Sequence, residues 1–349
     1  MRGLAVNRKG KLSVPELSMP ACGECQALVK TLSCGVCSGT DGKLIHGTFK
    51  DMREYPLLLG HEGVGRVVEV GRRVSKYKVD DVVLLPFLYS AQDGYFSGWG
   101  AYCEYAVVGD EGAFALAGQG VGTPGYDESC WAQTVIRPDD CADPVGASMI
   151  ITFREVLSAM RRFAFQANES IVIFGAGPVG LCFTRFAKLL GMGPVVTVDI
   201  NDNKANLASR MGADVVINSE KQDAEAQIRR LFPGGADNIV DAVGVNALIN
   251  QAMKLVKYGG KLCRYGISAD LNMQLDWSGG PYNWTLQFLQ FPSKRDEYQA
   301  HSQVMAWINA GVLDPSAFIS DVIPFERITD AFDLVEKQLP TTKKIVISY

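Results

Sequence analysis

The feature that most constrains the fold is a glycine-rich turn between an apolar run and a helix-length segment. Ile-Val-Ile-Phe at 171–174 is followed by glycines in G-x-G-x-x-G spacing. After a strand and before a helix, this spacing predicts a dinucleotide-binding turn: the glycines allow a tight turn, close approach of the backbone to a pyrophosphate, and close packing of helix on strand. The helix N-terminus adds free N–H groups for the phosphates. The predicted pyrophosphate-binding residues are Gly175, Gly177, Pro178, Val179 and Gly180.

An acidic residue completes this nucleotide-binding pattern. Pro194-Val-Val-Thr-Val-Asp199 is typical of the next strand, and Asp199 lies 24 residues after Gly175. A carboxylate about 20 residues beyond the turn binds the ribose 2′-hydroxyl of NAD. Asp199 is followed by Ile-Asn-Asp and by no arginine, so a 2′-phosphate would be repelled. The pattern therefore predicts NAD in preference to NADP.

Downstream of this turn the apolar pattern alternates between strand and helix periods. Strands are expected at 195–199, 214–217, 237–243 and 260–266, and helices at 178–190, 202–211, 221–231 and 246–257. Such alternation predicts βαβ units and a parallel sheet. Short strands are expected in residues 1–110, and mainly loops, with a strand at 104–108, in residues 86–140. A helix is expected at 143–165 and an irregular stretch after 268. A helix near 294–311 and a strand at 344–348 end the chain.

Length and composition exclude several classes of protein. A chain of 349 residues is long for one core and indicates two domains. The net charge is -4, with no basic run, which disfavours nucleic acid as a partner. The N-terminus has no apolar signal segment, and no apolar run reaches membrane-spanning length. A cytoplasmic protein without membrane contact is expected, whose nine cysteines are reduced.

Two short motifs upstream of the turn carry metal-binding side chains. The first is Cys34-Gly-Val-Cys37-Ser-Gly-Thr-Asp41, and the second is Gly60-His61-Glu62-Gly-Val-Gly65. Thiolate, imidazole and carboxylate all bind zinc, and a catalytic zinc takes three protein ligands and an open position. An alternative is a four-cysteine zinc site from Cys22, Cys25, Cys34 and Cys37. That alternative is disfavoured because eight residues separate the pairs, against roughly 15–20 in the usual ribbon.

Taken with the glycine turn, these motifs resemble the zinc-dependent medium-chain dehydrogenases, especially the sorbitol, glucose and threonine dehydrogenase branch. The resemblance extends over nearly the whole chain and includes Val-Gly-x-x-Val at 70–74, Asp-Asp-Val at 80–82 and Gly-Gly-Lys-Leu at 259–262. It implies an α/β fold: a doubly wound Rossmann domain at 148–294 and a β-rich, GroES-like catalytic domain at 1–147 and 295–349. It also implies a cleft between these domains and a homodimer or homotetramer.

The resemblance further implies a catalytic zinc bound by Cys37 and His61, with Glu62 as a ligand or a close neighbour. Asp143, before Pro144, matches the family's fourth acidic position, where Glu is usual; whether the shorter side chain reaches the metal stays open. The first motif is one residue longer than the family's, so the hydroxyl of the proton relay is Thr40 or Ser38, with Thr40 favoured because Thr-Asp stays together. No structural zinc is expected, because its four-cysteine lobe has only Cys103 here.

The predicted function is zinc-dependent transfer of a hydride between NAD and a secondary alcohol that is a polyol, sugar or cyclitol. Cys37, Thr40, His61 and Glu62 are the expected catalytic residues. One alternative is a zinc-free reductase of the quinone or enoyl type, which would need no Cys37, His61 or Glu62. Another is a non-catalytic NAD-binding sensor or structural protein, which the longer first motif and the Asp at 143 keep open.

Overall fold

The computed structural model describes residues 1–123, 126–137, 143–337 and 341–349. The chain divides into two compact units. Unit 1 combines Met1–Arg154 with Ser293–Tyr349, and unit 2 is Glu155–Pro292. Unit 2 is therefore inserted in the sequence of unit 1.

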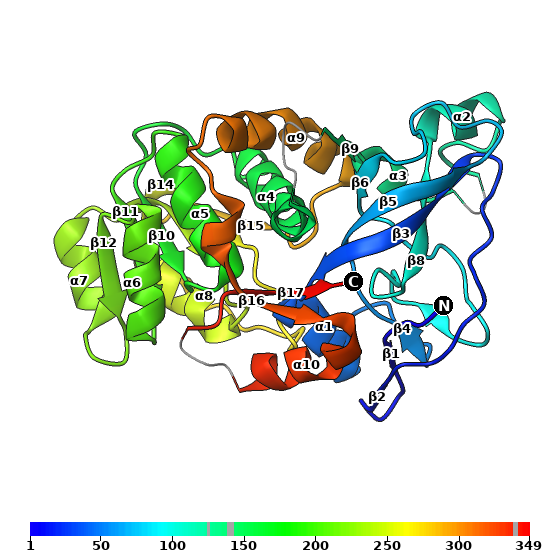
Figure 1. The fold of residues 1–349 in the computed structure, drawn as a ribbon. Helices are drawn as coiled ribbons and strands as arrows, with labels where there is room; N and C mark the ends of the chain where they lie inside the picture. The colour runs from blue at the N-terminus through cyan, green and yellow to red at the C-terminus, as the bar shows by residue number, and fades with distance from the viewer. Residues whose placement is uncertain (124–125, 138–142, 338–340) are drawn as a thin grey trace. The chain divides into compact units, whose positions relative to one another are not determined.

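Unit 2 is built on a parallel sheet with the strand order β12-β11-β10-β13-β14-β15 in its described residues. The strands are β10 (Ile171–Phe174), β11 (Val195–Asp199), β12 (Val215–Asn218), β13 (Ala236–Asp241), β14 (Val256–Arg264) and β15 (Thr285–Phe288). The connecting helices are α5 (Pro178–Leu189), α6 (Asp202–Met211), α7 (Ala224–Leu231) and α8 (Asn246–Met253). Figure 1 shows the alternation along the green and yellow part of the chain. This doubly wound α/β arrangement confirms the predicted fold class.

The strand pairing in this sheet brings the predicted nucleotide-binding residues to one edge. Phe174, the last residue of β10, pairs with Val198 on one side and Asp241 on the other. Because the strands are parallel, their carboxyl ends lie at the same edge, where ligands of such sheets bind. The strands themselves are held by a dry core: Val172, Val196 and Ile239 are fully buried. Burial of each such side chain contributes roughly 1.5–3 kcal/mol.

Unit 1 consists mainly of two sheets. In its described residues the larger has the order β16-β17-β3-β5-β6-β9, with β8 also paired to β3, and the smaller has the order β2-β1-β4-β7. The larger sheet contains β3 (Gln26–Gly35), β5 (Glu62–Val70), β6 (Val82–Leu84), β8 (Tyr105–Gly109), β9 (Val135–Ile136), β16 (Ile319–Pro324) and β17 (Lys344–Ser348). The smaller contains β1 (Ala5–Val6), β2 (Leu12–Ser13), β4 (Leu57–Leu58) and β7 (Phe96–Ser97). The last strand of the chain, β17, therefore pairs with β3, which lies near the start of the chain.

The helices of unit 1 connect and cover these strands. They are α1 (Ser38–Ile45), α2 (Glu111–Leu116), α3 (Ser129–Ala132), α9 (Lys294–Asn309), α10 (Ile328–Glu336) and the short 3-10 helices η2 (Pro315–Phe318) and η3 (Phe325–Arg327). The long helix α4 (Pro144–Arg162) passes from unit 1 into unit 2, which also contains η1 (Trp277–Gly279). Among the helices of the described ranges, none has the length and apolar character that a membrane crossing requires.

The structure differs from the sequence expectations mainly in the short elements. The segment 86–140, expected as loops with one strand, also contains α2, α3, β7 and β9. The stretch after 268, expected to be irregular, contains the strand β15. These elements have two to six residues, too few for a helical or strand period to repeat. Longer elements agree well, and β11, α6 and β17 have the expected bounds.

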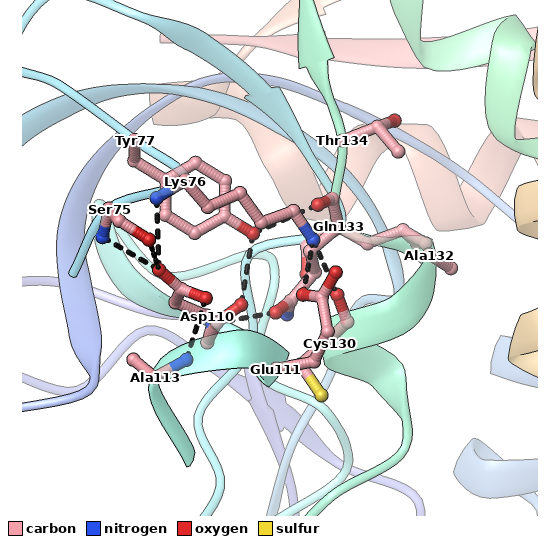
Figure 2. Close-up of polar contacts among 12 residues, drawn as sticks. Ser75, Lys76, Tyr77, Asp110, Glu111, Ala113, Cys130, Ala132, Gln133 and Thr134 are labelled. Atoms are coloured by element: carbon pink, nitrogen blue, oxygen red, sulfur yellow. Dashed lines mark hydrogen bonds and ion pairs between the residues drawn. The ribbon is translucent and has the colours of Figure 1, made fainter. Parts of the chain in front are cut away.

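A buried polar network holds the start of α2 in unit 1. Asp110 is the N-cap of α2, and its Oδ1 accepts a hydrogen bond of 3.0 Å from the amide of Ala113. Its Oδ2 accepts from the amides of Ser75 at 2.7 Å and Lys76 at 2.9 Å. Figure 2 shows this arrangement. We refer to Ser75, Lys76, Tyr77, Asp110 and Gln133 as the Asp110 cluster. One carboxylate thus fastens a helix start to a turn that lies far from it in the sequence.

Candidate metal and cofactor sites

Strand pairing brings the two metal-binding motifs of the sequence together. Gly35, at the end of β3, is paired with Glu62, at the start of β5, in antiparallel register. Cys37 lies two residues after the end of β3 and is the N-cap of α1, while His61 directly precedes β5. Among the described residues, the three side chains form a group whose donor atoms all lie within 4.8 Å of one another. We call Cys37, His61 and Glu62 the Cys37 cluster.

The donor set and its polar surroundings fit a zinc ion. Sulfur, imidazole nitrogen and carboxylate oxygen are the three kinds of ligand that zinc takes in proteins. His61 Nδ1 is buried, lies 3.6 Å from Oδ1 of Asp41, and neither atom has a hydrogen-bond partner. Burial alone would lower the pKa of His61, but polar interactions with Asp41 and Cys37 outweigh it and raise that pKa well above its usual value. The cluster therefore attracts positive charge, as a cation site must.

Glu62 is held by a lysine from the end of the chain. Lys344 donates hydrogen bonds of 2.8 Å to Oε1 and 2.6 Å to Oε2 of Glu62, and both side chains are buried. Thr152 lies 3.3 Å from Oε1. The carboxylate that Glu62 brings to the cluster is therefore ion-paired with Lys344. The signal for Lys344 in the sequence is a lysine directly before the apolar strand residues Ile-Val-Ile at 345–347.

The structure does not bring Asp143 into the Cys37 cluster. Asp143 is exposed and directly precedes α4. Its Oδ1 accepts from the amide of Val145 and its Oδ2 from the amide of Gly146, each at 3.0 Å. In this structure the carboxylate caps the start of α4, which is the usual role of an aspartate before a helix.

The two candidate hydroxyls for proton relay differ in their exposure. Ser38 and Thr40 both lie in the first turn of α1, which begins just after Cys37. Thr40 is buried and Ser38 is exposed. A buried hydroxyl close in sequence to a metal ligand is better shielded from exchange with bulk water than an exposed one, so burial is consistent with Thr40 as the preferred candidate.

The glycine turn in unit 2 has the conformations that its sequence predicts. Gly175 has a φ of +98°, a region that favours glycine. A Cβ on Gly180 would lie 1.8 Å from the carbonyl oxygen of Gly175, so no side chain fits between helix and strand. A Cβ on Gly177 would meet nothing within 4 Å, which leaves its backbone open. The first helical bond of α5 runs from Leu181 to Gly177, so the amides of residues 179 and 180 lie in the unbonded first turn.

Asp199 stands beside this turn at the end of β11. Its Oδ2 accepts a hydrogen bond of 2.7 Å from the amide of Ala176, inside the glycine turn. Its Oδ1 accepts one of 2.9 Å from the amide of Asn201. Each oxygen retains acceptor capacity, because a carboxylate oxygen has two lone pairs. The carboxylate is therefore fixed at the edge of the sheet where a ribose would lie.

Comparisons with known proteins place the chain in a family. Residues 23–140 match the alcohol dehydrogenase GroES-like domain, and residues 178–282 match the zinc-binding dehydrogenase domain. An alcohol dehydrogenase of Geobacillus stearothermophilus is 36% identical over 284 residues, which are 78% of this chain and 79% of that protein. The chain belongs to the zinc-dependent medium-chain dehydrogenase superfamily. The predicted family is confirmed, and the protein is a zinc-dependent oxidoreductase of alcohols.

Solved structures of medium-chain dehydrogenase fold match the whole chain at low identity. Galactitol-1-phosphate dehydrogenase from Escherichia coli has a TM-score of 0.80 at 20% identity and covers all of both chains. A short chain alcohol dehydrogenase from Escherichia coli CFT073, complexed with NADH, has a TM-score of 0.80 at 20% identity, with 100% and 99% of the chains covered. A zinc-binding dehydrogenase from Sinorhizobium meliloti, bound to NADP, has a TM-score of 0.77 at 21% identity, with 100% and 99% covered. These matches establish the shared fold.

Among the described residues, the other cysteines of this medium-chain dehydrogenase do not belong to the metal-capable group. Cys34 is fully buried, and burial raises the pKa of its thiol well above the usual value. Cys25 is also buried, whereas Cys22 is half-buried with its sulfur 3.4 Å from the carbonyl of Gln26. Within the described residues, the four-cysteine alternative is therefore not assembled, since the metal-capable group there is the Cys37 cluster.

Proposed function

We propose that this enzyme interconverts a secondary alcohol and a ketone with NAD as hydride carrier, and that its substrate is a polyol, sugar or cyclitol. The observation that carries the proposal is the Cys37 cluster, with its three kinds of zinc ligand within 4.8 Å. The glycine turn and Asp199 support the hydride carrier. The substrate class follows the sequence resemblance to the sorbitol, glucose and threonine dehydrogenase branch.

In this proposal Cys37, His61 and Glu62 hold the metal, and Asp143 is the candidate for a further ligand. A zinc ion there lowers the pKa of the substrate hydroxyl. The Thr40 hydroxyl accepts the hydroxyl proton and passes it toward solvent, with Ser38 as the alternative. Lys344 holds the carboxylate of Glu62 in place, because its ammonium group contacts both oxygens.

The preference for NAD rests on Asp199 and on the residue after it. A bound NAD would supply the hydride acceptor for the carbinol carbon, and the protein would supply its position. The carboxylate of Asp199 can accept from a ribose hydroxyl but repels a 2′-phosphate. The next residue, Ile200, is 61% exposed and provides no positive charge. The NADP-bound relative shares only the fold at 21% identity and does not decide the preference.

We also propose that the enzyme is a homodimer or homotetramer. The last strand in the sheet order of unit 2, β15, has a partner only in β14 among the described residues. Exposed aromatic residues lie on it and on its neighbour β14, namely Phe288 at 56% and Tyr258 at 67%. An unpaired strand edge with exposed aromatic side chains is a surface that proteins commonly cover.

The test is NADH formation by the purified, zinc-loaded protein. The panel contains polyols, aldoses, cyclitols, amino alcohols and simple alcohols, each with NAD or NADP and with or without a chelator. We expect turnover with one polyol, sugar or cyclitol class, with NAD, that the chelator abolishes. Turnover that survives metal removal would favour the zinc-free alternative. NAD binding without turnover on any alcohol would favour the non-catalytic sensor, and turnover on simple alcohols alone would overturn the substrate class.

A further inference from the structure

We propose that Tyr102 is a positioning residue for the metal site: its hydroxyl holds Asp41 so that the free oxygen of that carboxylate faces His61. The inference rests on the proposed role of the Cys37 cluster in binding zinc. Tyr102 is fully buried, and its hydroxyl lies 2.7 Å from Asp41 Oδ2 and 3.1 Å from the carbonyl oxygen of Gly35. A phenol has one proton to donate, and the shorter distance and the negative charge make Asp41 the main acceptor.

The two oxygens of Asp41 have different surroundings. Oδ2 accepts from Tyr102 and also from the amide of Cys37 at 3.0 Å, so two donors fix its position. Oδ1 is buried without a hydrogen-bond partner and lies 3.6 Å from His61 Nδ1. Because both donors bind Oδ2, Oδ1 remains available to the imidazole of His61. With Nδ1 facing Asp41, the remaining nitrogen of His61 is the one available to a metal.

Tyr102 is itself fixed to the backbone of both motifs. Its amide donates to the carbonyl of Leu59 at 3.0 Å, just before the Gly60-His61-Glu62 motif. Gly60 has a φ of +100°, and a Cβ there would lie 2.7 Å from the ring of Tyr102. The ring also packs edge-on against Phe332, with centroids 5.9 Å apart. The hydroxyl thus has little freedom to leave Asp41.

The expected consequence is a change in metal affinity. An acceptor held on the second nitrogen of a ligating histidine fixes its tautomer and raises its basicity, and loss of such a partner lowers metal affinity by about 10- to 100-fold. Without the Tyr102 hydroxyl, Asp41 Oδ2 keeps only the Cys37 amide, and the carboxylate can rotate away from His61. The effect reaches the metal through His61 and requires no contact between Tyr102 and substrate.

The experiment measures metal binding by the full-length protein in which Tyr102 is replaced by Phe. Metal-free wild type and Y102F are titrated with Zn²⁺ against a competing chelator, and the absorption spectrum of each Co²⁺-loaded protein is recorded. We expect zinc affinity to fall by about 10- to 100-fold in Y102F, with an altered Co²⁺ spectrum. Asp41→Asn, which removes the charge but keeps the size of the side chain, should give a similar loss and serves if Y102F does not fold.

Tyr77→Phe is the matched control. Tyr77 is also a buried tyrosine of unit 1, and its hydroxyl lies 3.0 Å from the carbonyl of Gly109 and 2.9 Å from that of Gln133, as Figure 2 shows for the latter. Its loss should lower stability and leave zinc affinity unchanged. Wild-type affinity and spectrum in Y102F, or equal weakening in Y102F and Y77F, would overturn the inference. A wild type that binds no zinc would instead overturn the proposed metal site.

Discussion

Unit 1 contains two groups of polar side chains, each with a buried carboxylate, whose hydrogen bonding differs. In the Asp110 cluster, both oxygens of Asp110 accept from backbone amides, and Gln133 accepts from the amide of Gly109 at 2.7 Å and donates to the carbonyl of Leu85 at 2.7 Å. In and beside the Cys37 cluster, His61 Nδ1 and Asp41 Oδ1 are buried without a hydrogen-bond partner.

This difference separates a structural role from a ligand-binding one. A buried polar atom without a partner costs roughly 1–3 kcal/mol, so a fold keeps one only where something else compensates for it. Within the described residues, no side-chain atom of the Asp110 cluster is left in that state. We infer that the Asp110 cluster stabilises the fold, whereas the surroundings of the Cys37 cluster are arranged for a cation.

The largest effect is expected when the Cys37 thiolate is removed. Cys37→Ala takes away the softest zinc ligand, so we expect turnover to fall by more than about 100-fold, the upper end of the cost of losing a partner that only orients a ligand. The unfolding midpoint of the metal-free protein should change little, because the half-buried Cys37 side chain contributes little packing. Zinc content, turnover and denaturant unfolding of the metal-free protein measure the three quantities.

Cys34→Ala is the control for that variant. Cys34 is in the same motif but fully buried, so its loss should cost packing and leave zinc content as in wild type. Retained zinc and turnover in Cys37→Ala would remove Cys37 from the metal site. A large fall in the stability of metal-free Cys37→Ala would mean that the Cys37 cluster also stabilises the fold, as the Asp110 cluster does.

For the Asp110 cluster we expect a loss of stability and no change in zinc content. Asp110→Ala removes a helix cap worth about 1 kcal/mol and leaves the amides of Ser75 and Lys76 without their acceptor. With the loss of these two further hydrogen bonds, each worth about 0.5–1.5 kcal/mol, the free energy of unfolding should fall by about 2–4 kcal/mol. Zinc content per folded molecule should stay at the wild-type level. Urea unfolding and metal analysis measure these outcomes.

Asp93→Ala is the comparison for that loss of stability. Asp93 also accepts from a backbone amide, that of Ser18, but it is exposed, so water can replace it. We expect a change of about 0.5 kcal/mol or less. Equal effects of the two substitutions would mean that burial of the Asp110 cluster contributes nothing. Loss of zinc in Asp110→Ala would mean that the two clusters are coupled.

Much of this architecture could be predicted from the sequence because its signals are local. The turn at Gly175 and each single strand or helix after it are indicated by consecutive residues, and Cys37 and His61 each belong to a short motif. The partners of those residues could not be predicted in this way. Lys344 is 282 positions from Glu62, and Tyr102 is 61 positions from Asp41. The pairing of β17 and β5 with β3 brings Lys344 to Glu62, and the hydrogen bond from the Tyr102 amide to the Leu59 carbonyl holds Tyr102 beside the second motif.

The placement of Asp143 illustrates a second limit. An acid before a proline matches the family's ligand position, but the same pair is also a favourable start for a helix, with Pro at the first position. In the structure its carboxylate accepts from the amides of Val145 and Gly146. The sequence pattern is the same for a cap and for a ligand, so it could not distinguish them.

The smallest expected effect is on the pH dependence of stability, which should have opposite signs for Asp110 and His61. Burial would raise the pKa of Asp110, but the amides of Ser75, Ala113 and Lys76 outweigh it and lower that pKa below its usual value. Its contribution to stability is therefore present above the unfolded pKa of about 3.9 and is lost as the pH falls through the folded pKa. The raised pKa of His61 means that its contribution in the metal-free protein is present below the unfolded pKa of about 6.5 and is lost as the pH rises through the folded value.

Two isosteric variants separate these contributions in the metal-free protein. The difference in unfolding free energy between wild type and Asp110→Asn should shrink as the pH is lowered from 7 toward 3, because wild type then loses the same charge. The difference between wild type and His61→Gln should shrink in the other direction, as the pH is raised from about 6. Urea midpoints across this pH range test both. If both differences changed in the same direction, the assignment of one cluster to anionic stabilisation of the fold and the other to attraction of a cation would be wrong, since only groups of opposite charge respond to protons with opposite sign.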